Sequence, residues 1–496
     1  MIDPAGKHLT SQPYVWGSTV VCAFLNFFIN DLSELSFYLK PRSLFPYSSL
    51  AHLTMESPAV PVPLDPREQP ILERLLRTRD ALLLLKQDKS SYIKSRDVLP
   101  LYEEVTQEVE KLNAARKEQD RRLIHNRLDY VLDDCFQLIS LLFLTVGRNN
   151  EAPAVYSLAT TIQRLLDHLE EAGFYSSKDL NSITKTVDTT RETLERGRNT
   201  YSPALLELLE SRLEQCQISL AKLQKGLSAL DPGLAQTHET LVSVLRSTSA
   251  VNTRSKFSST EVSNLREQLK KIEATLKDGK FVDADGNPLA GQADLKSLLE
   301  RCWRWTEIVL ERQGKIDERF QEQYDRLLEI RNQLDRLSVT QAWSLRETDL
   351  FGYQRKLDRI DEARVNGNFV DAEGQAADLH AQRTLLYLIR RSYAYIYALL
   401  ISSEPVSEAL LPVYNQLQTL RRCLIEVKES GGVANSRELY PYSMKLNSID
   451  NMRVDGKFYV GPDIPEGQGS VNALLAECYD LVWELRAAVT DEDAQA

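Results

Sequence analysis

Histidine and cysteine are the residue types in this chain with the widest chemistry, and their spacing argues against a metal site. The six histidines form no HxxxH or ExxH pair, which is the usual signature of a carboxylate-bridged metal centre in a helical bundle. The six cysteines are at least 55 residues apart and form no CxxC pair, so neither a zinc site nor a disulfide framework is indicated. We predict reduced core thiols, no metal and no cofactor.

One loop resembles the beginning of a calcium-binding EF-hand, because Asp283, Asp285 and Asn287 alternate along it. The rest of the loop does not fit. Its sixth position is Pro288, where an EF-hand needs Gly, and its twelfth is Asp294 rather than Glu. The sequence therefore predicts no calcium site here.

Motifs for nucleophilic or phosphate chemistry are also missing. The sequence has no GxSxG elbow, and Gly467 and Gly469 are followed by neither a third Gly nor a Lys-Ser/Thr pair. A Ser-His-Asp arrangement assembled only in space stays open, because its members need not be neighbours in sequence. We expect no catalytic residues, and an enzyme with an unrecognised site in a helical bundle is the alternative.

Residues 247–260 are rich in Ser and Thr and lack apolar periodicity, which favours an exposed linker between two helical halves. Basic residues lie two or three positions before Ser249, Ser258 and Ser259. We predict phosphorylation at these three serines, since the added charge would alter how the two halves dock.

The most specific feature of the sequence is a helix and loop repeated in its second half. The copies are LKKIEATLKDGKFVDADG from Leu269, LDRIDEARVNGNFVDAEG from Leu357 and LNSIDNMRVDGKFYVGPD from Leu446. In each, Leu is followed by Ile at +3, Gly at +10 and Phe at +12, and the starts lie 88 and 89 residues apart. A further apolar helical pattern follows every copy. The regularity predicts an internal repeat of about 88 residues.

The loops of this repeat supply the candidate site residues. We expect their shared glycines to end helices in the left-handed conformation and their shared phenylalanines to fold back onto the core. The alternative is that the loops contact a protein partner. The candidates are Gly279, Phe281, Asp283, Gly367, Phe369, Asp371, Gly456 and Phe458.

Long helices must position these loops, and the composition favours helices throughout. The chain has only 20 glycines and 19 prolines in 496 residues, and no Pro lies between Leu289 and Glu404. Apolar residues recur at helical spacing, and one helix is predicted from about Leu295 to Leu337. The expected fold class is all-α, with long antiparallel helices in bundle-like units.

Composition also divides the chain into six segments. Residues 1–54 lack helical periodicity, and the segment that Met55 opens is typical of a natural amino terminus, so we expect translation to start there. The predicted segments are 1–54, a misassigned or disordered extension; 55–68, a Pro-rich extended segment; 69–246, an N-terminal helical half; 247–260, the linker; 261–489, a C-terminal helical repeat half; and 490–496, an acidic tail.

Charge and hydropathy exclude two classes of partner. The net charge of −11 argues against a general nucleic-acid-binding surface. The apolar run from Val15 to Ile29 would span about 22 Å as a helix, short of the ~30 Å hydrocarbon core of a membrane. Cysteines without a pairing pattern favour a reducing compartment. We expect protein partners, no nucleic acid and no membrane.

The segment QPILERLLRTRDALLLLKQDKSSYIKSRDVLPLY and the DGKFVDADG-type loops resemble a fungal family of large, helix-rich proteins of unknown function. The resemblance covers nearly everything from Met55 to the end. It implies a cytoplasmic or nuclear location, no assigned catalysis, and an association with cullins. We therefore expect a non-enzymatic scaffold or adaptor that binds protein partners through repeat surfaces, with a cullin- or proteasome-associated regulator as the alternative.

Overall fold

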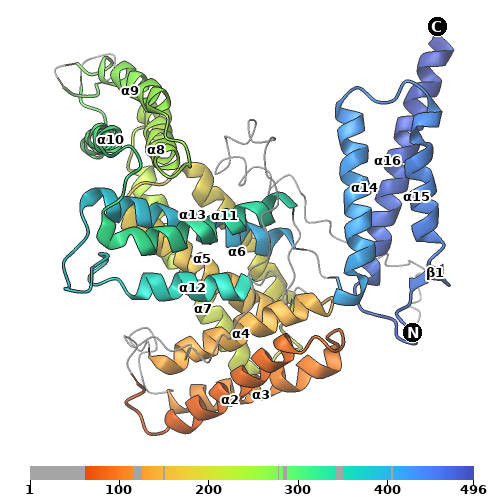
Figure 1. Ribbon diagram of the computed structural model, residues 1–496. Coiled ribbons are helices and arrows are strands. Elements are labelled where there is room, and N and C mark those ends of the chain that lie inside the picture. Colours follow the sequence, from red (N-terminus) through yellow and green to blue (C-terminus); the bar gives the residue numbers. More distant parts are fainter. Residues whose placement is uncertain are drawn as a thin grey trace.

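The computed structural model describes residues 62–116, 126–148, 151–277, 279–282, 287–340, 350–403 and 406–495. Helices dominate these ranges, and the only strands described in them form one hairpin (Figure 1). The all-α prediction is confirmed. No helix in these ranges is long and apolar enough to cross a membrane. The helices are α2 (Gln69–Gln87), α3 (Ser95–Ala115), α4 (Arg127–Thr145), α5 (Ala152–Ala172), α6 (Ser177–Gly197), α7 (Pro203–Ser228), α8 (Pro232–Asn252), α9 (Ser259–Glu273), α10 (Gln292–Arg312), α11 (Gln321–Thr340), α12 (Leu350–Glu362), α13 (Leu379–Ser402), α14 (Leu411–Glu429), α15 (Tyr440–Asp450) and α16 (Gln468–Gln495).

The largest body of the protein is built from α2–α7 and α11–α13 around one hydrophobic core. Within it, α5 packs against α4, α6, α7 and α13, so this helix lies at the centre. Large aromatic side chains fill the interior, among them Phe136, Tyr156 and Tyr393. The core joins helices that α8–α10 separate in sequence, so this body forms only when distant segments meet.

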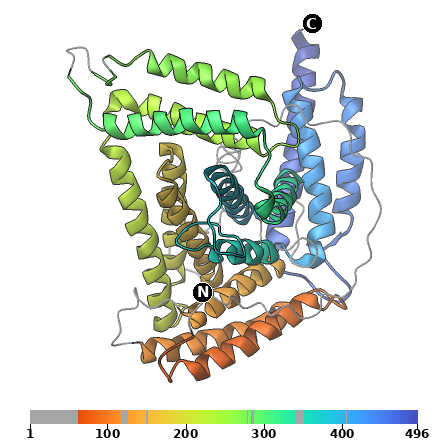
Figure 2. The same ribbon diagram turned by 60° about the vertical axis from the view of Figure 1, so that its left-hand side comes forward.

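Helices α8, α9 and α10 form a second unit with a core of its own, at one end of the large body (Figures 1 and 2). Its core includes Leu241, Cys302 and Trp305. Polar contacts attach it to the large body: Asn252 Nδ2 donates to Thr384 Oγ1 at 2.9 Å.

Helices α14, α15 and α16 form a third unit, which stands beside the large body (Figure 1). It meets that body at one end. Asp463 accepts hydrogen bonds there from Tyr92 Oη at 2.8 Å and Lys94 Nζ at 2.5 Å. Gly147 has φ +87°, and a Cβ on it would lie 2.7 Å from the carbonyl carbon of Glu466, so only glycine allows the two chains to approach this closely.

The same order of elements occurs three times: two helices, a hairpin loop and a third helix. Strands β1 (Arg453–Val454) and β2 (Lys457–Phe458) are the hairpin of the last copy. In the middle copy Val365 pairs with Asn368 in the same way. The three groups are α8–α10, α11–α13 and α14–α16. This order agrees with the repeat in the sequence, whose internal duplication stays a prediction.

The loop glycines do not end helices, which corrects the sequence interpretation. Helix α12 ends at Glu362, five residues before Gly367. Asn366 and Gly367 have φ +52° and +78°, the two left-handed positions of a type I′ hairpin turn. The glycines are left-handed as expected, but they follow Asn or Asp, and such pairs favour a two-residue hairpin turn.

The predicted linker at 247–260 is too long, because helix α8 continues to Asn252 and α9 begins at Ser259, and only residues 253–258 connect them. The hydroxyls of Thr248 and Ser249 donate to carbonyls four residues earlier, at 2.7 and 2.9 Å. These bonds satisfy the polar side chains inside the helix, which composition could not reveal. The chain also does not divide into halves here, since the large core joins residues 71–223 with residues 320–399.

The single helix expected from Leu295 to Leu337 is two helices. Gln313 and Gly314 have φ +49° and +79°, and these left-handed residues end α10 at Arg312. The chain then turns before α11 begins. The apolar spacing predicts the helix on each side, and Gln313-Gly314 is the local signal that separates them.

Candidate functional site

The loop phenylalanines are packing residues. Phe281, Phe369 and Phe458 are 5%, 3% and 2% exposed. The side chain of Gln382 accepts from the backbone N–H of Phe369 at 3.0 Å and donates to its carbonyl at 2.9 Å. Gln468 holds Phe458 in the same way, at 2.9 and 2.8 Å. The rings therefore anchor the loops and offer no surface to a partner.

The three loops do not assemble into one site. Asp371 accepts from the backbone N–H of Gln375 at 2.8 Å and pairs with Arg319 at 2.6 Å, so its carboxylate organises its own loop. Asp283 lies outside the described residues. The first loop contacts the start of α8, the second contacts η2 (Glu318–Phe320) and the third contacts the start of α3.

The three candidate phosphorylation sites differ in access. Ser249 is half-buried in α8 and accepts a hydrogen bond from Trp305 Nε1 at 3.0 Å. Ser258 caps α9, accepting from the backbone N–H of Glu261 at 3.3 Å, and Ser259 is exposed in the first turn. A kinase could reach Ser259 directly, whereas Ser249 would first have to leave the packing between α8 and α10.

The described cysteines act as core residues, apart from exposed Cys423. Burial raises the pKa of Cys302 to about 12 and that of Cys478 to about 11, so both thiols are protonated at neutral pH. Each of their sulfur atoms faces a carbonyl of a neighbouring helix, Leu241 at 3.5 Å and Leu417 at 3.6 Å. Within the described ranges, no group of three or more His, Cys, Asp and Glu side chains could hold a metal ion.

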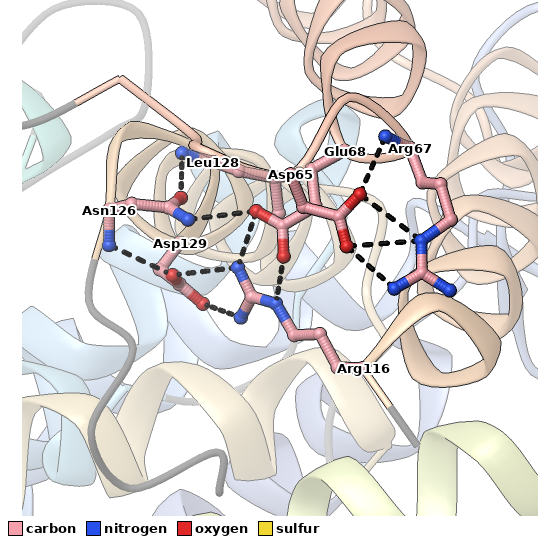
Figure 3. A network of polar contacts seen from close by, with 7 residues as sticks. All are labelled: Asp65, Arg67, Glu68, Arg116, Asn126, Leu128 and Asp129. Atoms are coloured by element: carbon pink, nitrogen blue, oxygen red, sulfur yellow. Dashed lines mark hydrogen bonds and ion pairs between the residues drawn. The ribbon is translucent and has the colours of Figure 1, made fainter. Parts of the chain in front are cut away.

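A buried ionic cluster fastens the ends of α2, α3 and α4 (Figure 3). Arg116 Nε donates to Glu68 at 2.6 Å and Nη1 donates to Asp129 at 2.8 Å. Asn126 Nδ2 also donates to Glu68, at 2.8 Å. Burial opposes the charge of Arg116, but the two carboxylates outweigh it and raise the pKa of the guanidinium. The charges are compensated within the cluster, which indicates a structural role.

A second set of buried charges lies between α4, α5, α12 and α13. Asp358 of α12 accepts from Arg164 of α5, and from Tyr393 Oη of α13 at 2.7 Å. Asp134 of α4 faces Arg355 of α12 at 3.3 Å, and burial raises the pKa of Asp134 to about 7 despite that arginine. Four helices enclose these groups, so we interpret them as the fastening of α5 onto the α12–α13 pair.

The third buried cluster contains a histidine between two helices. His168 of α5 lies 3.3 Å from Asp361 of α12 and 3.5 Å from Glu171 of its own helix. Burial alone would lower the pKa of His168, but hydrogen bonds to the two carboxylates outweigh it and raise the pKa above 6.5. Arg364 and Arg390 also pair with Glu171, whose pKa falls to about 2.

We expect His168→Gln to change the pH dependence of stability. The pKa of His168 is higher in the folded chain than its ordinary 6.5, so its protonated form stabilises the fold below pH 6.5. This contribution is lost as the pH rises through the folded pKa. Urea unfolding from about pH 5 to 9 should therefore show that wild type loses its advantage over the variant with rising pH. His238→Gln is the control, because burial lowers the pKa of His238 and its pH dependence should have the opposite sign.

The candidate interaction site is an exposed apolar face on α15 and α16. Tyr440 and Met444 are 65% and 50% exposed, and Trp483 is 70% exposed. Positions 440, 444 and 447 share one face of α15, and positions 479 and 483 share one face of α16. Asn447 accepts from Tyr479 Oη at 3.0 Å, which joins these two faces. We call Tyr440, Met444 and Trp483 the α15–α16 face.

The hairpin that follows α15 exposes a further apolar side chain of the third unit. Side chains alternate along β1 and β2, where Arg453 is paired with Phe458 and Val454 with Lys457. Because Phe458 is buried, Val454 points outward, and it is 59% exposed. Of the thirteen exposed large apolar residues in the described ranges, seven lie between positions 440 and 483. Such a concentration is typical of an interaction site.

Sequence reasoning found the loops but missed both the buried charges and this face. Trp483 was the available signal, since it directly follows Val482 of the buried stripe and adds a large ring on a polar side of the helix. No comparable signal marked Asp358 or Arg164. Charges in amphipathic helices are usually solvated, and only the assembled core shows that these are not.

Known proteins resemble this chain over most of its length. A family model described as a protein of unknown function, DUF2408, matches residues 227–347 and 404–496, which contain the α8–α10 and α14–α16 units. No solved structure matches. The Schizosaccharomyces pombe CUB1 family protein C30C2.08 is 40% identical over 86% of this chain and 94% of its own length. The Saccharomyces cerevisiae Cu(2+) suppressing and bleomycin sensitive protein 1 is 37% identical over 86% of this chain and 91% of its own. The chain therefore belongs to this fungal family of unknown function, the CUB1 family.

Proposed function

We propose that this protein is a non-enzymatic α-helical scaffold or adaptor that binds protein partners, with the α15–α16 face as its principal binding surface. The observation that carries the proposal is the gathering of exposed large apolar side chains on the third unit. Water contact with Tyr440, Met444 and Trp483 is unfavourable, and a protein partner that covered them would gain this burial free energy.

The construction of the rest of the molecule supports this role. Buried ion pairs such as Arg116–Glu68 and Arg164–Asp358 fasten helices to one another and leave little freedom in the large body. The third unit is attached at one end and keeps its outer side open. A firm frame that presents an open helical unit suits an adaptor.

The experiment is affinity purification of the full chain from fungal cells, with cross-linking and quantitative mass spectrometry. We expect at least one stoichiometric partner whose cross-links fall within residues 406–495. A cullin or a proteasome subunit among these partners would support the alternative, a regulator associated with a cullin or the proteasome.

The matched variants are Trp483→Ala together with Met444→Ala, and Ile218→Ala. Ile218 is also exposed but lies on α7, away from the third unit. The double variant should lose the partner and the α7 variant should keep it. A folded, abundant protein with no partner above background would contradict the proposal, as would a partner retained by both variants.

A further inference from the structure

The middle unit shows what can lie on a helix pair of this kind. Aligning Leu357 with Leu446 aligns α12 with α15, and their hairpins are followed by α13 and α16. In the middle unit the pair α12–α13 is covered by helix α5. Arg164 of α5 bonds to Asp358 of α12 and to Tyr393 Oη of α13, the latter at 3.2 Å.

A second contact fixes the same helix further along. Glu171 of α5 pairs with Arg364 after α12 at 2.5 Å and with Arg390 of α13 at 3.2 Å. His168 lies between these contacts and faces Asp361. One helix thus spans both members of the pair and buries the side that they share.

The corresponding side of the third unit is open. Asp358 and Asp361 correspond to Asn447 and Asp450 of α15. Tyr393 and Tyr397 of α13 correspond to Tyr479 and Trp483 of α16. Tyr393 bonds to Asp358 as Tyr479 bonds to Asn447, and Gln382 holds Phe369 as Gln468 holds Phe458. The place that α5 takes in the middle unit therefore lies over Asn447 and Tyr479, and Trp483 lies one turn further along α16. The helices that pack most closely on α15 and α16 belong to their own unit.

The first unit, α8–α10, does not share the exposed apolar side chains of the third. Among the described residues of α8–α10, no large apolar side chain is exposed, so this unit leaves no apolar face open to a further helix. The third unit instead exposes Tyr440 at 65% and Trp483 at 70%. In the middle unit, helix α5 covers the corresponding helix pair. The third unit exposes large apolar side chains at this place, which points to a helix as its occupant.

Charge specifies the occupant further. Residues 406–496 contain eight Lys and Arg against fourteen Asp and Glu. Asp480 lies one turn before Trp483 in the helix and is exposed, whereas Glu484 pairs with Lys428 of α14 at 2.8 Å. Ala476 and Ala487 lie about two turns and one turn from Trp483 on the same side of α16, and these small side chains allow close approach of another backbone.

We propose that the α15–α16 face binds an amphipathic α-helix of a partner protein, in the place that α5 takes on the α12–α13 pair. This inference rests on the proposed adaptor function and names the partner's chemistry. The apolar stripe of the helix packs on Tyr440, Met444 and Trp483, and a Lys or Arg residue at its edge faces Asp480. Helix binding through anchors at i, i+3, i+4 and i+7 is a common mode of recognition.

The test begins with site-specific photo-crosslinking in the full chain in fungal cells. A benzophenone amino acid replaces Asn451 on one side of the face, or Asp480 on the other, and the same amino acid at Ile218 on α7 is the control. Mass spectrometry then maps the cross-linked partner segment. We expect both positions on the face, and not the control, to cross-link to one segment of one partner with an apolar stripe and a basic edge.

A synthetic peptide of the mapped segment provides the quantitative test with purified full chain. It should become helical on binding, and Trp483→Ala should weaken its affinity about 30-fold, as expected for a buried aromatic anchor. Ile218→Ala should leave the affinity unchanged. Unchanged circular dichroism of the Trp483→Ala chain would show that the variant is folded.

Other outcomes overturn the inference. The partner segment could bind in extended form, or the face could cross-link to a second copy of this chain or to lipid. Each of these results would identify a different occupant. Partners that purify normally but never cross-link at 451 or 480 would leave the adaptor function standing and refute the helix site. If no partner purifies at all, both proposals fail.

Discussion

Asp358→Ala should destabilise the large body by about 3–5 kcal/mol, the usual cost of removing one partner from a buried ion pair. Asp358 is 2% exposed and accepts from both Arg164 and Tyr393. Its loss leaves the Arg164 charge without that carboxylate, in surroundings where water cannot replace it. Urea unfolding followed by circular dichroism, with hydrogen exchange to locate the change, should show loss of protection in α5, α12 and α13.

Two further variants test whether the loss of stability comes from the buried charge of Asp358. Asp358→Asn keeps an acceptor for Tyr393 but removes the charge, so its effect should lie between wild type and Asp358→Ala. Glu195→Ala removes the carboxylate of an exposed ion pair with Arg198, and its unfolding transition should match wild type. Equal transitions for Asp358→Ala and Glu195→Ala would show that the buried network does not hold α5 in place.

The helical character of the fold was predictable because it depends on local patterns. Apolar residues at steps of three and four mark one side of each helix, and few Gly or Pro interrupt them. The hairpins were also predictable in principle. Asn366-Gly367 and Asp455-Gly456 are the residue pairs that type I′ turns favour, and a left-handed glycine alone does not distinguish such a turn from a helix end.

The grouping of helices was not predictable, because it depends on contacts between distant segments. Residues 247–260 have the composition of a linker, but a hydroxyl can bond to its own helix, and Thr248 is fully buried there. Helix α13 belongs to the core of the large body rather than to a C-terminal half. Its Tyr393 and Arg390 meet partners on α5 more than two hundred residues earlier, and no local pattern predicts that.

The candidate site was also not predictable from the sequence, for a different reason. Exposure of Trp483 is a property of the assembled unit, since α14 and α15 cover other sides of α16. Comparison with the middle unit shows why this exposure is unusual. Aligned positions carry Tyr397, which is buried in the large body, and Trp483, which is exposed, so equivalent positions lie in a core in one unit and on the surface in another.

Because the units have separate cores, the same substitution at two aligned positions should destabilise different parts of the protein. Phe369→Ala and Phe458→Ala each remove a buried ring and should each cost about 3–5 kcal/mol. Phe369 packs into the core of the large body, whereas Phe458 packs into the separate core of α14–α16. We therefore expect Phe369→Ala to loosen α11–α13 and α5, and Phe458→Ala to loosen only the third unit.

Native-state hydrogen exchange on the full chain separates these effects, because it reports the opening of each helix individually. The third unit meets the large body at one end, through contacts such as those of Asp463 and Glu466, so its opening need not disturb the core beyond. Loss of protection in α4, α5 or α13 after Phe458→Ala would show instead that the units unfold together. Independent opening would mean that a partner held on the α15–α16 face stabilises the unit that binds it and leaves the frame unchanged.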